Sequence, residues 1–73
     1  MTQKIKKIIS EFTGIDYSSI RSDMLIEDDL HMNEYDIEDL LEEVEIEFNV
    51  EFEDKNRDFI YISDLIVFIK ESI

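Results

Sequence analysis

Residues 27–48 read EDDLHMNEYDIEDLLEEVEIEF and combine an acidic turn, a helix-start signal and an amphipathic helix. Asn33 is a favourable N-cap, and Asp36 three residues later can complete a weak capping box. Apolar residues then recur at i, i+3, i+4, i+7 and i+11, a spacing that predicts a buried helix face. This predicted core stripe consists of Ile37, Leu40, Leu41, Val44 and Phe48.

The opposite face of this helix is the candidate binding surface. At about 100° per residue it carries Tyr35, Asp39, Glu42 and Ile46, with Glu45 beside them. Single exposed apolar residues are ordinary on protein surfaces, and Tyr35 could instead pack back on the loop around Met32. We favour a contact strip with a charged surround, because Tyr35 and Ile46 share one stripe.

The acidic residues are concentrated in the same part of the chain. Of the 20 Asp and Glu residues, 15 lie from Asp23 to Asp54, and no Lys or Arg lies between Arg21 and Lys55. A net charge of −13 argues against binding nucleic acid or an anionic membrane and favours a partner with a basic face. The chain has no Cys, no apolar run of membrane-spanning length and no signal-peptide pattern, so we expect a cytoplasmic monomer.

A first helix is predicted before this stretch. Its apolar face has the same helical spacing and consists of Ile5, Ile8, Ile9 and Phe12. Thr2 is the predicted N-cap, and Gly14 is the predicted C-cap. Three lysines, Lys4, Lys6 and Lys7, either offset the acidic helix across the bundle or form a solvated face. Residues 15–29 have no sustained period and predict a long, packed connection that holds a short helical turn.

The last part of the chain predicts a final helix. Val50 and Phe52 suggest an extended loop, 54–58 a single helical turn, and 59–62 an apolar patch. Ser63 is the predicted N-cap, with Asp64 in the first turn. The predicted inward face consists of Ile62, Leu65, Ile66, Ile69 and Ile73, widened by Phe68, with Val67 pointing away. Residues 1–73 thus predict one all-α domain, a small four-helix bundle with three main helices, a short third helix and a long first loop.

At this level of detail the sequence resembles the acyl carrier protein family. Gly14-Ile15-Asp16 resembles the Leu-Gly-Val turn after the family's first helix, and Glu27 to Leu30 resembles the acidic lead-in to its modification site. Residues 37–52 resemble the second helix and the segment after it, and Ile62-Ser63-Asp64 the start of the last helix. The resemblance implies the carrier fold and an acidic second helix that meets basic enzyme patches.

The sequence departs from the family at the residue that carries the chemistry. The family motif is Asp-Ser-Leu, whose Ser bears the 4′-phosphopantetheine arm, and the corresponding residues here are Asn33-Glu34-Tyr35. Glu34 has no hydroxyl for the arm, and its charge opposes an incoming phosphate. No Ser or Thr occurs from Asp23 to Ile62, so a short register shift does not restore the site. We therefore predict that the protein carries no cofactor.

No catalytic or metal site can be derived from the remaining residues. His31 lies among acids, but the spacing matches no EF-hand loop, and a solvated turn explains it better. Our first hypothesis is a non-enzymatic, acyl-carrier-like binding module that docks through Tyr35, Asp39, Glu42, Glu45 and Ile46 on a basic partner enzyme, in lipid or secondary-metabolite biosynthesis. The alternative is an acidic inhibitor or immunity-type protein that blocks a basic enzyme such as a nuclease. A working carrier with an unusual attachment site is a third, disfavoured by the missing Ser.

Overall fold

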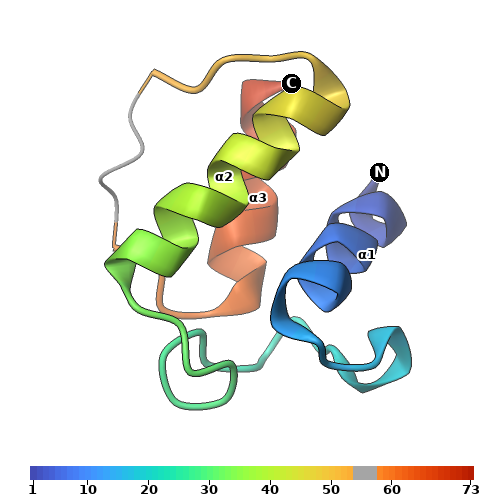
Figure 1. The fold of residues 1–73 in the computed structure, drawn as a ribbon, viewed down its shortest axis with the longest axis vertical. Helices are drawn as coiled ribbons and strands as arrows, with labels where there is room; N and C mark the ends of the chain where they lie inside the picture. The colour runs from blue at the N-terminus through green and yellow to red at the C-terminus, as the bar shows by residue number, and fades with distance from the viewer. Residues whose placement is uncertain (54–57) are drawn as a thin grey trace.

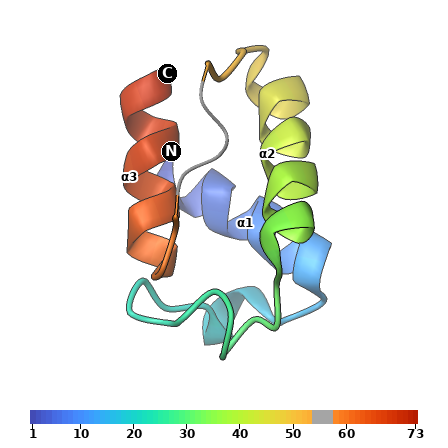
Figure 2. The ribbon, with the colours of Figure 1, turned by 90° about the vertical axis from the view of Figure 1, so that its left-hand side faces the viewer.

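The computed structural model describes residues 1–53 and 58–73. Within these ranges the chain forms α1 (Thr2–Thr13), the 3-10 turn η1 (Tyr17–Ser19), α2 (Glu34–Phe48) and α3 (Ile62–Ser72). Figures 1 and 2 show α2 and α3 running in the same direction, with α1 packed across them and the connection after η1 closing one end. The all-α prediction is confirmed. The predicted short third helix falls on 54–58, of which 54–57 lie outside the described residues and Asp58 is not helical.

The three helices meet through the apolar stripes that the sequence predicts. Leu40, Leu41 and Val44 of α2 are completely buried, and Ile37 and Phe48 pack against the core from its edge. The other helices contribute Ile5, Ile8, Ile9, Ile62, Leu65, Ile66, Phe68 and Ile69. No polar side chain is buried among the described residues, so burial of apolar surface is the main stabilising term. Ile73 was predicted to face inward and is 45% exposed, because α3 ends at Ser72.

The start of α2 has the predicted local geometry, and its end is closed by a left-handed residue. The Asn33 side-chain oxygen accepts a hydrogen bond from the Asp36 N–H at 2.9 Å, and the Asp36 carboxylate accepts one from the Asn33 N–H at 3.0 Å. This reciprocal pair satisfies two backbone donors and confirms the capping box. At the other end Asn49 adopts a left-handed conformation with φ 55°, and Gly14 closes α1 in the same way with φ 78°.

The predicted N-caps of the other two helices are wrong. Helix α1 already includes Thr2, follows Met1 and has no side-chain cap; the Thr2 hydroxyl instead accepts a hydrogen bond from Lys70 Nζ at 3.1 Å. Helix α3 begins at Ile62, and its N-cap is Tyr61, two residues before the expected cap Ser63. There Asp64 satisfies the free donors, since its carboxylate accepts from the N–H groups of Ile60 and Tyr61 at 3.2 and 2.9 Å.

A short backbone pairing joins the first connection to the start of α3. Leu25 and Tyr61 form an antiparallel bridge, with the Ile26 N–H donating to the Ile60 carbonyl at 2.9 Å and the Ile62 N–H to the Met24 carbonyl at 3.0 Å. The connection then turns back on itself, because the Met32 N–H donates to the Ile26 carbonyl at 3.2 Å. The strand-like segment 24–26 therefore contacts both Met32, the residue before the α2 cap, and Ile62, the first residue of α3.

The capping box gives a direct stability test. We expect Asn33→Ala to lower the free energy of unfolding by about 1 kcal/mol, because it leaves the Asp36 N–H without its side-chain acceptor. In a domain of this size the melting temperature should fall by about 4–8 °C, measured by circular dichroism. Asn33→Asp is the matched control, since it keeps the acceptor oxygen and should stay close to wild type. Equal losses in the two variants would contradict the role of the cap.

Candidate functional site

The outer face of α2 is exposed along its whole length. Tyr35 is 68% exposed and Ile46 82% exposed, and Asp39 and Glu42 between them are also at the surface. The helical rise of about 1.5 Å per residue separates the two apolar residues by roughly 16 Å. Met32 in the preceding loop is buried, whereas Tyr35 is mostly exposed. This exposure argues against the alternative that Tyr35 packs back on the loop around Met32. We call Tyr35, Asp39, Glu42 and Ile46 the outer strip.

The C-terminal end of the outer strip is hollowed. Ile46 and Val50 line a shallow groove there, whose other lining residues are Glu42, Glu45, Asn49 and Glu51. The left-handed Asn49 turns the chain and brings Val50 and Glu51 beside the helix. Sequence reasoning missed these two residues as part of the surface, although the Asn49 position after the last apolar residue is a recognised C-cap pattern.

Glu45, the fifth predicted binding residue, has an additional structural role. One of its carboxylate oxygens accepts a hydrogen bond from the Phe52 N–H at 2.8 Å, and the side chain is half-buried. Phe52 is itself part of the core, so this contact ties the segment after α2 to the helix. The Glu45 carboxylate therefore points toward the segment after α2, whereas Asp39 and Glu42 are exposed to solvent.

A lysine of α1 partly offsets the charge of α2. Lys4 Nζ lies 3.4 Å from the Glu47 carboxylate and 5.2 Å from the centre of the Phe48 ring. Both charged side chains are about half-exposed, so the ion pair contributes little stability in water. The prediction that the α1 lysines face the acidic helix is confirmed for Lys4, and the outer strip itself has no such neighbour among the described residues.

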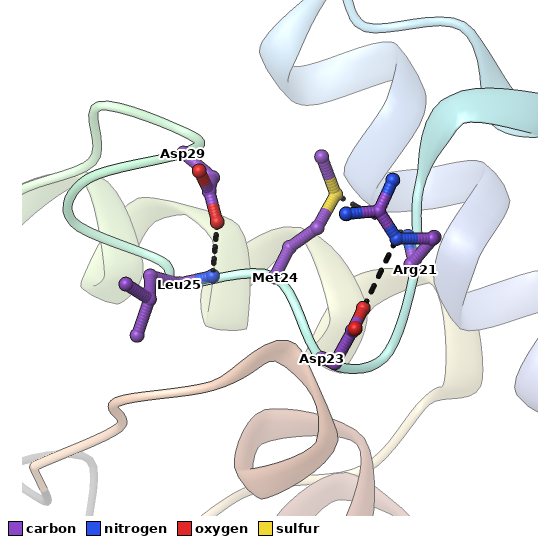
Figure 3. Close-up of polar contacts among 5 residues, drawn as sticks. All are labelled: Arg21, Asp23, Met24, Leu25 and Asp29. Carbon is purple, nitrogen blue, oxygen red and sulfur yellow. Dashed lines mark hydrogen bonds and ion pairs between the residues drawn. The ribbon is translucent and has the colours of Figure 1, made fainter.

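The acidic segment before α2 has three exposed carboxylates, of which one, that of Asp29, accepts a backbone hydrogen bond. Asp29 accepts a hydrogen bond from the Leu25 N–H at 2.7 Å, and this closes the turn that Figure 3 shows beside the exposed Arg21–Asp23 pair. Glu27 and Asp28 are exposed and have no hydrogen bond or ion pair with another described residue. They extend the negative surface beyond the N-terminal end of α2.

The first turn of α2 has two carboxylates, those of Glu34 and Asp36, and no Ser or Thr. Glu34 is the first helical residue and is exposed, directly after the Asn33 cap. The nearest Ser or Thr before Glu34 in sequence is Ser22 and the nearest after it is Ser63, and the Ser63 N–H donates to the Ser22 carbonyl at 2.9 Å. Both residues therefore lie at the other end of the backbone pairing, beside the start of α3.

The described residues contain no group of three His, Asp or Glu side chains that could hold a metal ion. His31 is exposed and adopts a left-handed conformation with φ 56°, in the turn just before the α2 cap. Among residues 1–53 and 58–73 there is also no helix long and apolar enough to cross a lipid bilayer. The chemistry available at this surface is that of carboxylates around exposed apolar side chains.

Comparison with known proteins agrees with the helical architecture. No family model matches the chain. An acyl carrier protein of Thermotoga maritima is 32% identical to it over 71 residues, which covers 96% of this chain and 88% of that protein.

The chain belongs to the acyl carrier protein family. The match covers nearly the whole of both proteins, so it includes α1, α2 and α3 and the connections between them. In this member of the family, α2 combines the outer strip with eight acidic residues from Glu34 to Glu47 and no Lys or Arg.

The density of acids on α2 predicts a response to salt. Glu38 with Glu42 and Glu43 with Glu47 are like-charge pairs at i, i+4, and each pair destabilises the helix by a few tenths of a kcal/mol. Screening should relieve this repulsion, since the Debye length falls to about 3 Å at 1 M salt. We expect the melting temperature to rise by several degrees between low salt and 1 M NaCl.

The variant Glu38→Gln/Glu43→Gln is the control for this experiment. It removes one member of each pair, so it should melt higher at low salt and gain less from NaCl. A general salting effect on apolar surface would leave the gain unchanged. A flat or falling melting temperature in the wild type would mean that the α2 acids are individually paired.

Proposed function

We propose that this protein is a non-enzymatic binding module of the acyl carrier protein family that works without a phosphopantetheine arm. In this proposal it docks through the outer strip of α2 on the basic face of a partner enzyme, in lipid or secondary-metabolite biosynthesis. The observation that carries the proposal is the outer strip, two exposed bulky side chains set among carboxylates. Such a surface favours a partner that presents Lys or Arg around an apolar centre.

The residues at the start of α2 do not fit the family's prosthetic group. Attachment of the arm as a phosphate ester requires a hydroxyl, and the resemblance aligns the modified Ser with Glu34. The Glu34 carboxylate at this exposed position adds negative charge where a phosphate would have to approach. We therefore derive no carrier step for this chain, and its proposed role is binding alone.

The absence of the arm can be tested by mass. Incubation with coenzyme A and a promiscuous phosphopantetheinyl transferase should leave the intact mass of the protein unchanged, because no hydroxyl is available at residue 34. A mass gain of roughly 340 Da, the mass of the arm, would contradict the proposal. Glu34→Ser is the companion variant. Its modification would mean that only the hydroxyl is missing, whereas an unmodified variant would mean that Tyr35 and the preceding turn have also removed transferase recognition.

The docking surface can be tested once a natural partner has been captured by affinity purification. We expect Tyr35→Ala and Ile46→Ala to weaken binding by about 1–2 kcal/mol each, chiefly through faster dissociation, because buried bulky side chains carry most of the affinity. Asp39→Lys and Glu42→Lys should instead slow association and flatten its dependence on salt. Surface plasmon resonance at several NaCl concentrations separates these effects.

Two matched variants make this experiment specific. Tyr17→Ala removes an exposed tyrosine outside α2, and Glu11→Lys changes the net charge as Glu42→Lys does but lies on α1. Both should retain wild-type affinity. Equal losses in Glu11→Lys and Glu42→Lys would mean that overall charge, not the outer strip, attracts the partner. A lower melting temperature of Tyr35→Ala with unchanged affinity would support packing of Tyr35 instead.

A further inference from the structure

A second groove lies on α3, away from the outer strip of α2. It runs between residues 58–59 and the exposed side of α3, and is lined by Asp58, Phe59, Asp64, Val67, Phe68 and Glu71. Figure 2 shows the segment that leads into α3 descending beside the helix, so the two walls come from adjacent parts of the chain. None of the residues proposed to bind through α2 contributes to this groove.

The floor of the groove is apolar. Val67 is 52% exposed, although the residues on either side of it in sequence, Ile66 and Phe68, are buried. The Phe59 ring is only partly buried and packs edge-on against Phe68, with 5.2 Å between the ring centres. Since Phe68 also contacts Phe52 at 5.2 Å, the floor rests on a fixed aromatic cluster of the core.

The rim of the groove is acidic. On α3, Asp64 and Glu71 lie one turn before and one turn after Val67, at i−3 and i+4, so the three side chains share one helix face. Asp58 supplies a third carboxylate from the opposite wall. The Asp64 carboxylate accepts hydrogen bonds from the Ile60 and Tyr61 N–H groups. The side-chain carboxylates of Asp58 and Glu71 make no hydrogen bond or ion pair with any residue of the described ranges. No Lys or Arg is among the described residues that line the groove.

The carboxylates that line the groove favour a cationic occupant. A second copy of a chain with net charge −13 would be repelled, as would an anionic lipid surface. The described residues do not gather the three ligands that a metal ion would need. An arginine side chain matches both parts of the groove: its aliphatic stem can lie on Val67 and Phe59, and its planar guanidinium can hydrogen-bond carboxylates.

We propose that this groove is a second docking site, independent of the outer strip, and that it takes an arginine side chain of a basic partner protein. The partner can thereby contact the protein on two faces. Binding at both sites raises the apparent affinity when one partner spans them.

The site can be tested without a natural partner. The probe is N-acetyl-L-arginine amide, titrated into the ¹⁵N-labelled protein while backbone amide shifts are recorded. We expect saturable shifts, with a millimolar dissociation constant, in residues 58–59 and 64–71. N-acetyl-L-citrulline amide has the same stem and no charge, and should bind several-fold more weakly because it lacks the ionic contact.

Variants separate the floor from the rim. We expect Glu71→Gln to weaken the arginine probe by about two- to fivefold, the range for one exposed charge pair. Val67→Ala should weaken it by about threefold through lost apolar contact. Glu11→Gln removes an equal charge on α1 and should have no effect. Asp64 is left intact, since it also holds the start of α3.

Three results would overturn the proposal. Shifts that spread over the acids of α2 without preference for the groove would mean unspecific attraction. Equal binding of the arginine and citrulline probes would remove the argument from charge. Shifts of the same amides on dilution of the protein alone would identify a second copy as the occupant. Because the titration uses no partner, these results do not depend on whether the outer strip is the main docking surface.

Discussion

The structure depends on a very small piece of backbone pairing. Residues 24–26 and 60–62 are far apart in sequence, and the bridge between Leu25 and Tyr61 holds them side by side. The outward-facing N–H groups of both bridge residues are covered by carboxylates, those of Asp29 and Asp64. Carboxylates here act as local caps that leave no free strand edge for another chain. Helix α3 begins at this pairing, and Met32, two residues before α2, donates its N–H to the Ile26 carbonyl, so the pairing connects the starts of the two helices.

The charge distribution follows from how the core is built. Apolar side chains from three helices fill the interior, and no polar group is buried among the described residues. None of the acids in the described part of the chain is buried in the core, so repulsion between them is moderated by water and salt. Lys4 of α1 reaches Glu47 on the flank of α2, which leaves the outer strip as a negative surface with apolar ends. A protein with this arrangement can keep its fold while its surface is specialised for a charged partner.

Membership of the acyl carrier protein family depends on the whole chain, whereas the chemistry of residue 34 depends on one side chain. The family relation rests on the helices and connections that form the core, and these tolerate changes at exposed positions. Glu34 is exposed at the first turn of α2, so the fold depends little on which side chain stands at this position.

Periodicity and local capping chemistry were sufficient to predict the three main helices, the core stripe of α2, its capping box and the exposure of Tyr35, Asp39, Glu42 and Ile46, because these features depend on neighbours within one or two turns. The start of α3 was predicted two residues late, since Ser63 is a good N-cap in isolation, but its N–H donates to the Ser22 carbonyl and Tyr61 is the N-cap. The second role of Glu45, the addition of Val50 and Glu51 to the surface, and the groove beside Val67 could not be derived from the sequence. Each of these features depends on where a non-helical segment packs against α2 or α3. That position is determined by tertiary contacts and not by the local sequence.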